Sequence, residues 1–300
     1  MKACKAFFSL IRVKHYLKNI LVFLPLVFSV NLTNPDKLIP TLIGFLAFCM
    51  GASVIYIVND IRDVEKDRQH STKCKRPLPS GAISVSAAIA IAVLFSVVAA
   101  VLMAILCVLY GSSLWSVVWI VLYVVLNFGY SFGLKNIPIV DLLILASGFV
   151  IRVLFGGAVA GIEVSEWLLL VMAAGALYLG MGKRKGELLK EGEGTRAVNK
   201  RYNVGFLERN MYLCLSLTLV FYALWCITSG TIDCFANGQA IIWSVLWVLV
   251  IVLRYNYLIE GESDGDPVSV LTHDPMLMLL AFGFALYMLF VVYIPIGGGT

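Results

Sequence analysis

Long apolar segments alternate with short polar ones along nearly all of the 300-residue chain. Apolar segments near or above about 18 residues are typical of helices that cross a membrane. We predict nine such spans, near residues 15–31, 38–60, 83–110, 113–132, 138–160, 165–181, 208–229, 238–258 and 275–296. The pattern therefore predicts an all-α, polytopic membrane protein. Because no long polar stretch interrupts it, we expect one transmembrane domain over residues 1–300.

The first span has a competing interpretation as a signal peptide, because a basic segment precedes it. Against this, the basic segment is long, the apolar run contains Pro25, and no small-x-small cleavage site follows. We therefore expect a retained helix at the N-terminus.

The distribution of Lys and Arg predicts the topology. All of them except Lys37 and Arg152 lie in the N-terminus, in loops 61–82, 133–137, 182–207 and 259–274, or at the helix ends that touch these segments. Cytoplasmic segments carry an excess of Lys and Arg. We predict a multi-pass protein of the inner (plasma) membrane, with the N-terminus cytoplasmic and the C-terminus outside.

Composition excludes a water-soluble protein. Hydrophobic residues make up 60% of the chain and charged residues 14%, and the mean hydropathy is +0.91. The formal net charge of +5 reflects loop topology rather than nucleic-acid binding, which we do not expect. The seven cysteines contain no CxxC pair and give no disulfide or zinc pattern.

The candidate chemistry begins where the second span ends, with Asn59, Asp60, Asp63 and Asp67. Spacings of three and seven residues place the three carboxylates on one helix face. Such a stripe is costly at a membrane helix end unless a cation neutralises it. Hard oxygen ligands suit Mg²⁺, which also binds the phosphates of a substrate.

Cationic residues follow directly, at Lys73, Lys75 and Arg76, and Pro77 and Pro79 then favour a loop. A carboxylate stripe beside a cationic loop is what a metal–diphosphate site requires. The alternative is a solvated helix end with ordinary juxtamembrane charges.

Polar residues within the apolar spans are further candidates. Asn127 and Tyr130 follow helical spacing and lead to Lys135, although a buried Asn also serves as a plain helix–helix hydrogen bond. Asp141 and Arg152 are eleven residues apart, which is three helical turns, so they share a helix face. We expect them to line one polar cavity with the aspartate stripe, unless each is satisfied by another helix.

Three more cations could bind phosphate: Lys18 in the first span, and Lys183 and Arg184 at the end of the sixth. Arg binds phosphate through two donors at once. Each of these positions is equally explained by anchoring at the cytoplasmic surface.

The segment NDIRDVEKD at residues 59–67 resembles the UbiA-type intramembrane prenyltransferase family, whose first signature is NDxxDxxxD. The KRPLPSG that follows and the nine predicted spans are similar to that family over essentially the whole chain. The resemblance implies an intramembrane transferase whose nine helices surround a central polar cavity open to the cytoplasm. It also implies Mg²⁺ as cofactor.

The second acidic signature of aromatic-acceptor members, DxxxD, is missing, because residues 182–207 contain no aspartate. GKRKGEL stands there instead. Together with HYLKN and YSFGLKNIPIVDLL, it resembles the polyprenyl-phosphate (decaprenyl-phosphate) phosphoribosyltransferase branch. That branch moves 5-phosphoribosyl from phosphoribosyl pyrophosphate (PRPP) to a polyprenyl phosphate and releases pyrophosphate.

The resemblance implies roles for the candidates. Asn59, Asp60, Asp63 and Asp67 would hold Mg²⁺, and Asp141 would bind ribose hydroxyls or orient a cation. Phosphate and substrate contacts would come from Lys18, Lys73, Lys75, Arg76, Asn127, Tyr130, Lys135, Arg152, Lys183 and Arg184.

Two alternatives stay open at this point. One is a prenyltransferase that moves a polyprenyl group from its diphosphate to an aromatic acceptor such as 4-hydroxybenzoate. The other is a non-catalytic carrier of lipid phosphate whose acidic stripe acts as a gate.

Overall fold

The computed structural model describes residues 2–69, 73–191, 198, 201–260 and 267–295. Residues 70–72, 192–197, 199–200 and 261–266 of the predicted cytoplasmic loops lie outside this description. Every regular element in the described residues is helical. The elements are α1 (Lys2–Leu10), η1 (Val13–Phe23), α2 (Leu24–Phe28), α3 (Pro35–Arg62), α4 (Val64–Arg68), η2 (Lys73–Lys75), α5 (Val85–Leu109), α6 (Leu114–Phe132), η3 (Leu134–Asn136), α7 (Val140–Ala160), α8 (Glu166–Glu191), α9 (Val204–Ile227), α10 (Ser229–Cys234), η6 (Gly238–Trp243), α11 (Ser244–Ile259), α12 (Pro267–His273) and α13 (Pro275–Tyr293). The all-α prediction is confirmed.

Eight helices of the described chain are long and apolar enough to cross a membrane. They coincide with the second to ninth predicted spans, and most boundaries agree within about three residues. The protein is thus a multi-pass membrane protein.

The first predicted span is not among these eight helices. Residues 13–23 form a 3₁₀ helix and residues 24–28 a short α-helix. A 3₁₀ helix rises about 2.0 Å per residue and an α-helix 1.5 Å, so the two pieces together extend about 30 Å. The count of nine spans is therefore not confirmed, although this segment has the length of a bilayer core.

Helix α8 continues to Glu191, well beyond its predicted end at residue 181. The added segment is rich in Lys, Glu and Leu, which are good helix formers. An ion pair at i, i+3 between Arg184 and Glu187, at 2.7 Å, supports the extra turns. Helix α9 also begins earlier than predicted, because the side chain of Asn203 caps it by accepting a hydrogen bond from the Phe206 N–H.

The chain groups into two compact units. The N-terminal unit comprises Met1–Val27, Asn31–Phe132 and Ile151–Glu163, and the C-terminal unit comprises Phe28–Val30, Gly133–Val150 and Val164–Thr300. Helix α7 contributes its first half to the C-terminal unit and its second half to the N-terminal unit. The expectation of one domain over 1–300 stays a prediction.

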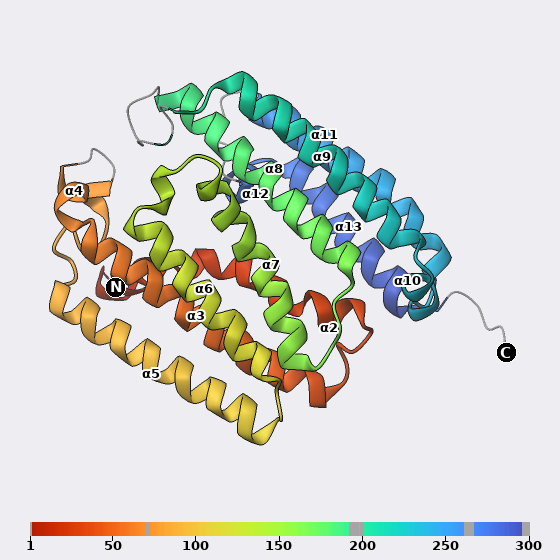
Figure 1. Cartoon of the computed structure of the whole chain (residues 1–300), viewed down its shortest axis with the longest axis horizontal. Helices are drawn as coiled ribbons and strands as arrows, with labels where there is room; N and C mark the ends of the chain where they lie inside the picture. The colour runs from red at the N-terminus through yellow and green to blue at the C-terminus, as the bar shows by residue number, and fades with distance from the viewer. Residues whose placement is uncertain (1, 70–72, 192–197, 199–200, 261–266, 296–300) are drawn as a thin grey trace. The chain divides into compact units, whose positions relative to one another are not determined.

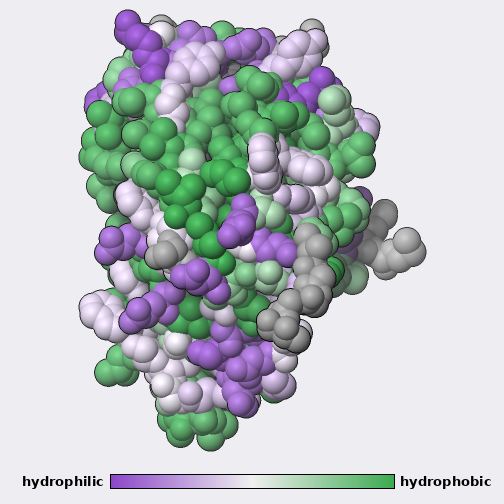
Figure 2. Space-filling model, turned by 90° about the vertical axis from the view of Figure 1, so that its right-hand side faces the viewer, coloured by the Kyte–Doolittle hydropathy of each residue, from purple (hydrophilic) through white to green (hydrophobic). Residues whose placement is uncertain are grey.

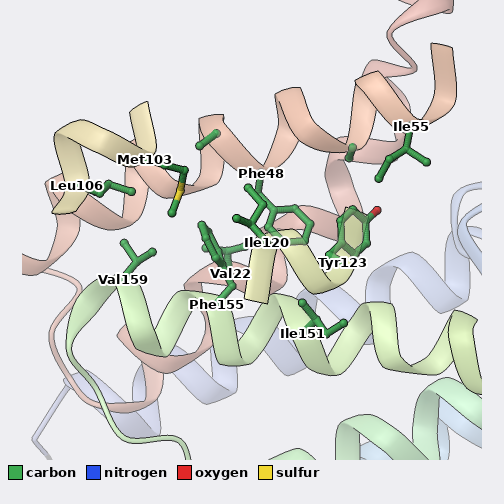
Figure 3. Close-up of a cluster of buried hydrophobic side chains, with 12 residues drawn as sticks. Val22, Phe48, Ile55, Met103, Leu106, Ile120, Tyr123, Ile151, Phe155 and Val159 are labelled. Atoms are coloured by element: carbon green, nitrogen blue, oxygen red, sulfur yellow. The ribbon is translucent and has the colours of Figure 1, made fainter. Parts of the chain in front are cut away.

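Within the N-terminal unit, α3 lies alongside α5 (Figure 1). Its core is a cluster of aromatic and aliphatic side chains in which Phe48 packs against both Tyr123 and Phe155 (Figure 3). Val22 of η1 belongs to the same cluster, opposite Gly156 of α7. A Cβ atom at Gly156 would lie 2.0 Å from the Val22 carbonyl oxygen, so only glycine allows this close approach.

Within the C-terminal unit, α8 lies alongside α9 (Figure 1). Its core gathers Tyr178, Met211, Tyr255 and Leu277 from four different helices. Tyr178 also donates a hydrogen bond to the side chain of Asn256.

Large hydrophobic side chains cover much of the helix exteriors. On α5 alone, Val93, Leu94, Val97 and Val101 are all exposed. Figure 2 shows one face of the molecule on which hydrophobic residues form wide areas and hydrophilic residues gather in groups. Exposed apolar surface on this scale fits helices whose solvent is lipid.

Candidate active site

The acidic stripe of the N-terminal unit forms a cluster with two arginines. Asp60 is only 3% exposed and Asp67 only 4%. Nη1 of Arg76 lies 2.7 Å from Asp67 Oδ2 and 3.4 Å from Asp60 Oδ1. Nη2 of Arg12 lies 2.5 Å from the same Oδ1 of Asp60. Two buried carboxylates thus converge on one cationic group.

The stripe keeps its helical spacing across the junction between two helices. Helix α3 ends at Arg62 and α4 begins at Val64, with Asp63 between them. The Asp63 N–H donates to the Asn59 carbonyl at 3.0 Å, and the Asp67 N–H donates to the Asp63 carbonyl at 2.8 Å. These i to i−4 bonds preserve the predicted spacing. They bring Asp60 and Asp67 together at Arg76, and Asp63 lies half-buried at the junction.

The sequence did not identify Arg12 as a site residue, because the basic residues of the N-terminus were attributed to membrane topology. Its guanidinium stacks on the Tyr56 ring, 4.7 Å from the centroid. The backbone beside it is held by Ser53, whose Oγ donates to the Ile11 carbonyl at 2.8 Å. Ser53, Tyr56 and Asp60 are spaced three and four residues apart, so one face of α3 positions Arg12. The spacing of these three polar residues was the only sign in the sequence that this face of α3 binds something, and it does not identify Arg12 as the residue bound.

The donor set fits a magnesium ion that is shared with a substrate. Among the described residues, no group of three Asp, Glu, His or Cys side chains is arranged to hold a metal by itself. Mg²⁺ does not require one, because it keeps several waters and usually takes one or two carboxylates plus substrate phosphates. Asp60 and Asp67 already meet at one cation, Arg76, and can supply those two carboxylates.

Three other predicted residues, Asn59, Lys73 and Lys75, lie near the stripe in sequence, and Lys18 lies earlier in the chain. Asn59 is half-buried at the end of α3, Lys73 is half-buried in η2, and Lys75 is exposed there. Lys18 is half-buried on η1. Their phosphate-binding roles stay predictions.

Arg152 belongs to a separate buried network of the N-terminal unit. It is 5% exposed. Its Nε donates to Asn19 Oδ1 at 2.8 Å and its Nη2 donates to the Tyr123 hydroxyl at 3.0 Å. The guanidinium also lies over the rings of Tyr123 and Phe48. These contacts come from other elements of the N-terminal unit. They match the alternative that Arg152 is satisfied by neighbouring helices.

Asp141 lies at the centre of a buried network in the C-terminal unit. Asp141 is 0% exposed and Arg184 1% exposed. Arg184 Nε lies 2.9 Å from Asp141 Oδ2, and the Tyr202 hydroxyl donates to Oδ1 at 2.7 Å. Burial raises the pKa of Tyr202 above its ordinary value, and its hydrogen bond to Asp141 raises it further. The ion pair with Arg184 is compatible with the predicted role of Asp141 in orienting a cation, and both predicted roles of Asp141 stay predictions.

The cations of the GKRKGEL segment are largely neutralised by carboxylates. Arg184 Nη1 lies 2.7 Å from Glu187, in addition to its pair with Asp141. Lys185 is buried and lies 2.7 Å from Glu208. Lys183 is half-buried. The expectation that Arg184 holds a phosphate stays a prediction, and a phosphate there would share the guanidinium with two carboxylates.

The remaining candidates on α6 and after it are partly buried. The Asn127 side chain donates to the Tyr123 carbonyl of its own helix at 2.8 Å, which is a local structural bond. Tyr130 and Lys135 are half-buried. The expected cavity combines residues of both units and stays a prediction.

Buried carboxylates and arginines at the end of a membrane helix are costly, and in membrane proteins such residues mark functional sites. The sequence profile described as the UbiA prenyltransferase family matches residues 21–273, and the chain therefore belongs to that family.

Relatives of the chain carry a more particular name. It is 34% identical over 289 residues to the decaprenyl-phosphate phosphoribosyltransferase of Corynebacterium glutamicum, which covers 95% of this chain and 86% of the relative. It is 31% identical to the protein of the same name from Mycolicibacterium smegmatis, over 90% of this chain and 87% of the relative.

Solved structures share the fold. A UbiA homologue from Archaeoglobus fulgidus, solved bound to GPP and Mg²⁺, superposes with a TM-score of 0.69 at 19% identity, covering 96% of this chain and 100% of that one. The structure of the A. fulgidus homologue bound to DMAPP and Mg²⁺ gives a TM-score of 0.67, covering 96% and 99%.

Proposed function

We propose that this protein transfers the 5-phosphoribosyl group of PRPP to a polyprenyl phosphate at the cytoplasmic membrane face and releases pyrophosphate. The observation that carries the proposal is the likeness, over nearly the whole chain, to proteins named decaprenyl-phosphate phosphoribosyltransferase. The charge pattern agrees with it. One acidic stripe serves one diphosphate donor, and the aspartate-free segment 182–207 leaves no second stripe for a prenyl diphosphate.

The acidic stripe receives the donor. Asp60 and Asp67, with Asp63 and Asn59 beside them, would hold a Mg²⁺ ion together with the donor's diphosphate. When bound, Mg²⁺ neutralises charge on the leaving pyrophosphate. Arg76 lies at 2.7 Å from Asp67, where its guanidinium can add a second positive charge to the same diphosphate.

The acceptor needs binding and orientation rather than a base. A phosphate monoester oxygen of the lipid is already anionic at neutral pH, so no proton has to be removed before it attacks carbon 1 of the ribose. Attack occurs opposite the leaving pyrophosphate and inverts carbon 1. Lys18, Lys135 and Lys183 are the lysines proposed to bind the lipid phosphate or the donor's 5-phosphate.

The two arginine networks are proposed to position rather than to react. Asp141 holds Arg184 at 2.9 Å in the C-terminal unit, and Asn19 and Tyr123 hold Arg152 in the N-terminal unit. Fixed cations in low-dielectric surroundings attract anionic substrates more strongly than the same charges in water.

The proposed orientation places the N-terminus in the cytoplasm and the C-terminus outside. It follows from the Lys and Arg distribution and puts the acidic stripe on the side where PRPP is available. A cysteine-labelling experiment on Cys4 with a membrane-impermeant reagent tests this in intact cells. Cys4 is exposed, and so is Cys234 at the end of α10, which the proposed orientation places outside, so the labelled residue is identified by peptide mapping. Labelling of Cys4 before lysis would contradict the orientation.

The proposed reaction is tested with detergent-purified protein, labelled PRPP, undecaprenyl phosphate and Mg²⁺. We expect a labelled product that extracts into organic solvent, that requires Mg²⁺, and that is lost in Asp60→Ala and Asp63→Ala. Full activity in both variants would contradict the assignment of the acidic stripe.

A second candidate is prenyl transfer from a polyprenyl diphosphate to an aromatic acceptor. The family description and the prenyl diphosphates named for the A. fulgidus structures favour it at the level of the fold. Turnover of a prenyl diphosphate with 4-hydroxybenzoate, without turnover of PRPP, would support this candidate. A carrier without catalysis would turn over neither donor and would tolerate Asp63→Asn.

A further inference from the structure

We infer that Arg12 is a built-in counter-cation of Asp60 that the metal–diphosphate complex displaces and then uses, so that divalent metal and diphosphate bind cooperatively. The inference rests on the proposed function, because it assumes that a diphosphate donor binds with a metal at the acidic stripe. It assigns a role to a residue outside the aspartate signature, 48 positions earlier in the chain.

Arg12 and a bound metal ion would compete for the same oxygen atom, Oδ1 of Asp60. Asp60 Oδ1 accepts from Arg12 at 2.5 Å and lies 3.4 Å from Arg76. A divalent ion bound by that oxygen would stand within van der Waals distance of both guanidiniums, where like charges repel. Metal binding by Asp60 therefore requires Arg12 to move away from Oδ1.

The surroundings of Arg12 suit such a movement. Its side chain is 20% exposed, whereas that of Asp60 is 4% exposed, so the guanidinium is on the open side of the pair. The adjacent Leu10 and Ile11 are buried in a hydrophobic cluster, and Ser53 holds the Ile11 carbonyl. The backbone is thus anchored and only the long side chain has to turn.

The backbone at Arg12 is held in an unusual conformation. Its φ of 54° and ψ of 51° are in the left-handed region, which residues other than glycine rarely adopt. Such strain persists where the surrounding structure fixes it, and it is concentrated at functional positions. Arg12 lies between α1 and η1, and in this conformation its side chain contacts Asp60 and Tyr56.

A metal ion alone and a metal–diphosphate complex differ in whether they supply an anion that Arg12 can bind. A metal ion alone takes Asp60 from Arg12 and provides no anion in return. A metal–diphosphate complex takes the same carboxylate but supplies phosphate oxygens, which a guanidinium binds through two parallel donors. Metal alone therefore binds weakly, metal with diphosphate binds tightly, and by linkage each ligand increases the affinity for the other.

The test uses Mn²⁺ and inorganic pyrophosphate as probes with the full-length protein in detergent. Free Mn²⁺ is measured by electron paramagnetic resonance, first without pyrophosphate. Binding of labelled pyrophosphate is then measured at saturating Mn²⁺, with correction for the complex that forms in solution. The variants are Arg12→Gln, Arg12→Lys and a matched control, Arg68→Gln. Arg68 is next to Asp67 in sequence but is exposed and pairs with Glu65 at 2.8 Å.

We expect Arg12→Gln to shift the two affinities in opposite directions. Mn²⁺ alone should bind about fivefold more tightly, which corresponds to an ion pair of about 1 kcal/mol, and pyrophosphate at saturating Mn²⁺ about fivefold more weakly. Arg12→Lys should keep the Mn²⁺ affinity of the wild type and recover part of the pyrophosphate affinity. Arg68→Gln should change either value by less than about twofold.

A purely structural role for Arg12 would weaken both affinities together, and that result would overturn the inference. If Arg12→Gln does not fold, Arg12→Lys provides the test. It should keep the Mn²⁺ affinity of the wild type and weaken pyrophosphate binding at saturating Mn²⁺, because Lys keeps the charge but lacks the two parallel donors, and a parallel loss of both affinities would overturn the inference. Wild-type protein that binds neither probe would refute the metal–diphosphate site of the proposed function itself, which distinguishes the two failures.

Discussion

Replacing Tyr202 by Phe removes one hydroxyl from the buried network of the C-terminal unit. This hydroxyl donates to Asp141 Oδ1 at 2.7 Å and accepts from the Ile139 N–H at 2.6 Å. Phe fills nearly the same volume, so the ring packing on Phe206 is retained. The substitution therefore isolates two hydrogen bonds.

The two losses differ in size. Asp141 is fully buried, and a hydrogen bond to a buried charged group contributes about 1.5–3 kcal/mol. The Ile139 N–H is only partly buried, so water can replace its partner at a cost of about 1 kcal/mol or less. Ile139 also has a φ of 71°, and losing this bond leaves a strained backbone with one restraint fewer. We expect the free energy of unfolding to fall by about 2–3 kcal/mol.

Thermal unfolding in detergent measures this effect. A loss of this size corresponds to a Tm lower by about 4–8 °C for a chain of this length. Tyr212→Phe is the matched control on α9, because the Tyr212 hydroxyl makes a single bond to Glu260 at 3.1 Å and the residue is 45% exposed. We expect the control to change the free energy of unfolding by less than about 0.5 kcal/mol. Equal Tm values for the two variants would refute the assignment of Tyr202 to a stabilising network.

The difference in stability between the wild type and Tyr202→Phe is predicted to depend on pH. The pKa of Tyr202 is raised in the folded protein by burial, so the folded state favours the protonated hydroxyl. The advantage of wild type over Tyr202→Phe is therefore fully present below the ordinary tyrosine pKa of about 10, and it is lost as pH rises above that value. A Tm difference that grows above pH 10 would contradict this sign.

Three further outcomes are expected. Gly156→Ala should lower Tm, because its Cβ would lie 2.0 Å from the Val22 carbonyl oxygen, and overpacking of this kind costs about 1–3 kcal/mol. Gly51→Ala, whose Cβ would have its nearest neighbour at 3.8 Å, should leave Tm unchanged or raise it, and the reverse order of the two would show that η1 does not pack as described. Asp274→Asn should lower Tm at neutral pH, because hydrogen bonds from Arg254 lower the pKa of the Asp274 carboxyl, and the difference should vanish as pH falls through that lowered pKa. A difference that stays constant as pH falls through the acid range would assign the effect to something other than this ion pair.

The sequence by itself determined the membrane spans and the acidic stripe. A helix must be about 20 apolar residues long to cross a bilayer, so eight of the predicted spans could be read from hydropathy alone. The Asn59–Asp67 spacing likewise required only the 3.6-residue helical period, and the i to i−4 bonds through Asp63 preserve it. Both features depend on neighbours along the chain.

Tertiary structure alone decided how the buried charges are paired. Arg12 lies 48 residues from Asp60, and Arg184 lies 43 from Asp141, and no local pattern links either pair. The sequence therefore assigned Arg12 to topology and Arg184 to phosphate binding. It also predicted the first span as a helix like the others, whereas residues 13–23 form a 3₁₀ helix, and Val22 in that helix packs closely on Gly156. Pairing and close packing are set by which helix faces meet, and that information is absent from any single stretch of the chain.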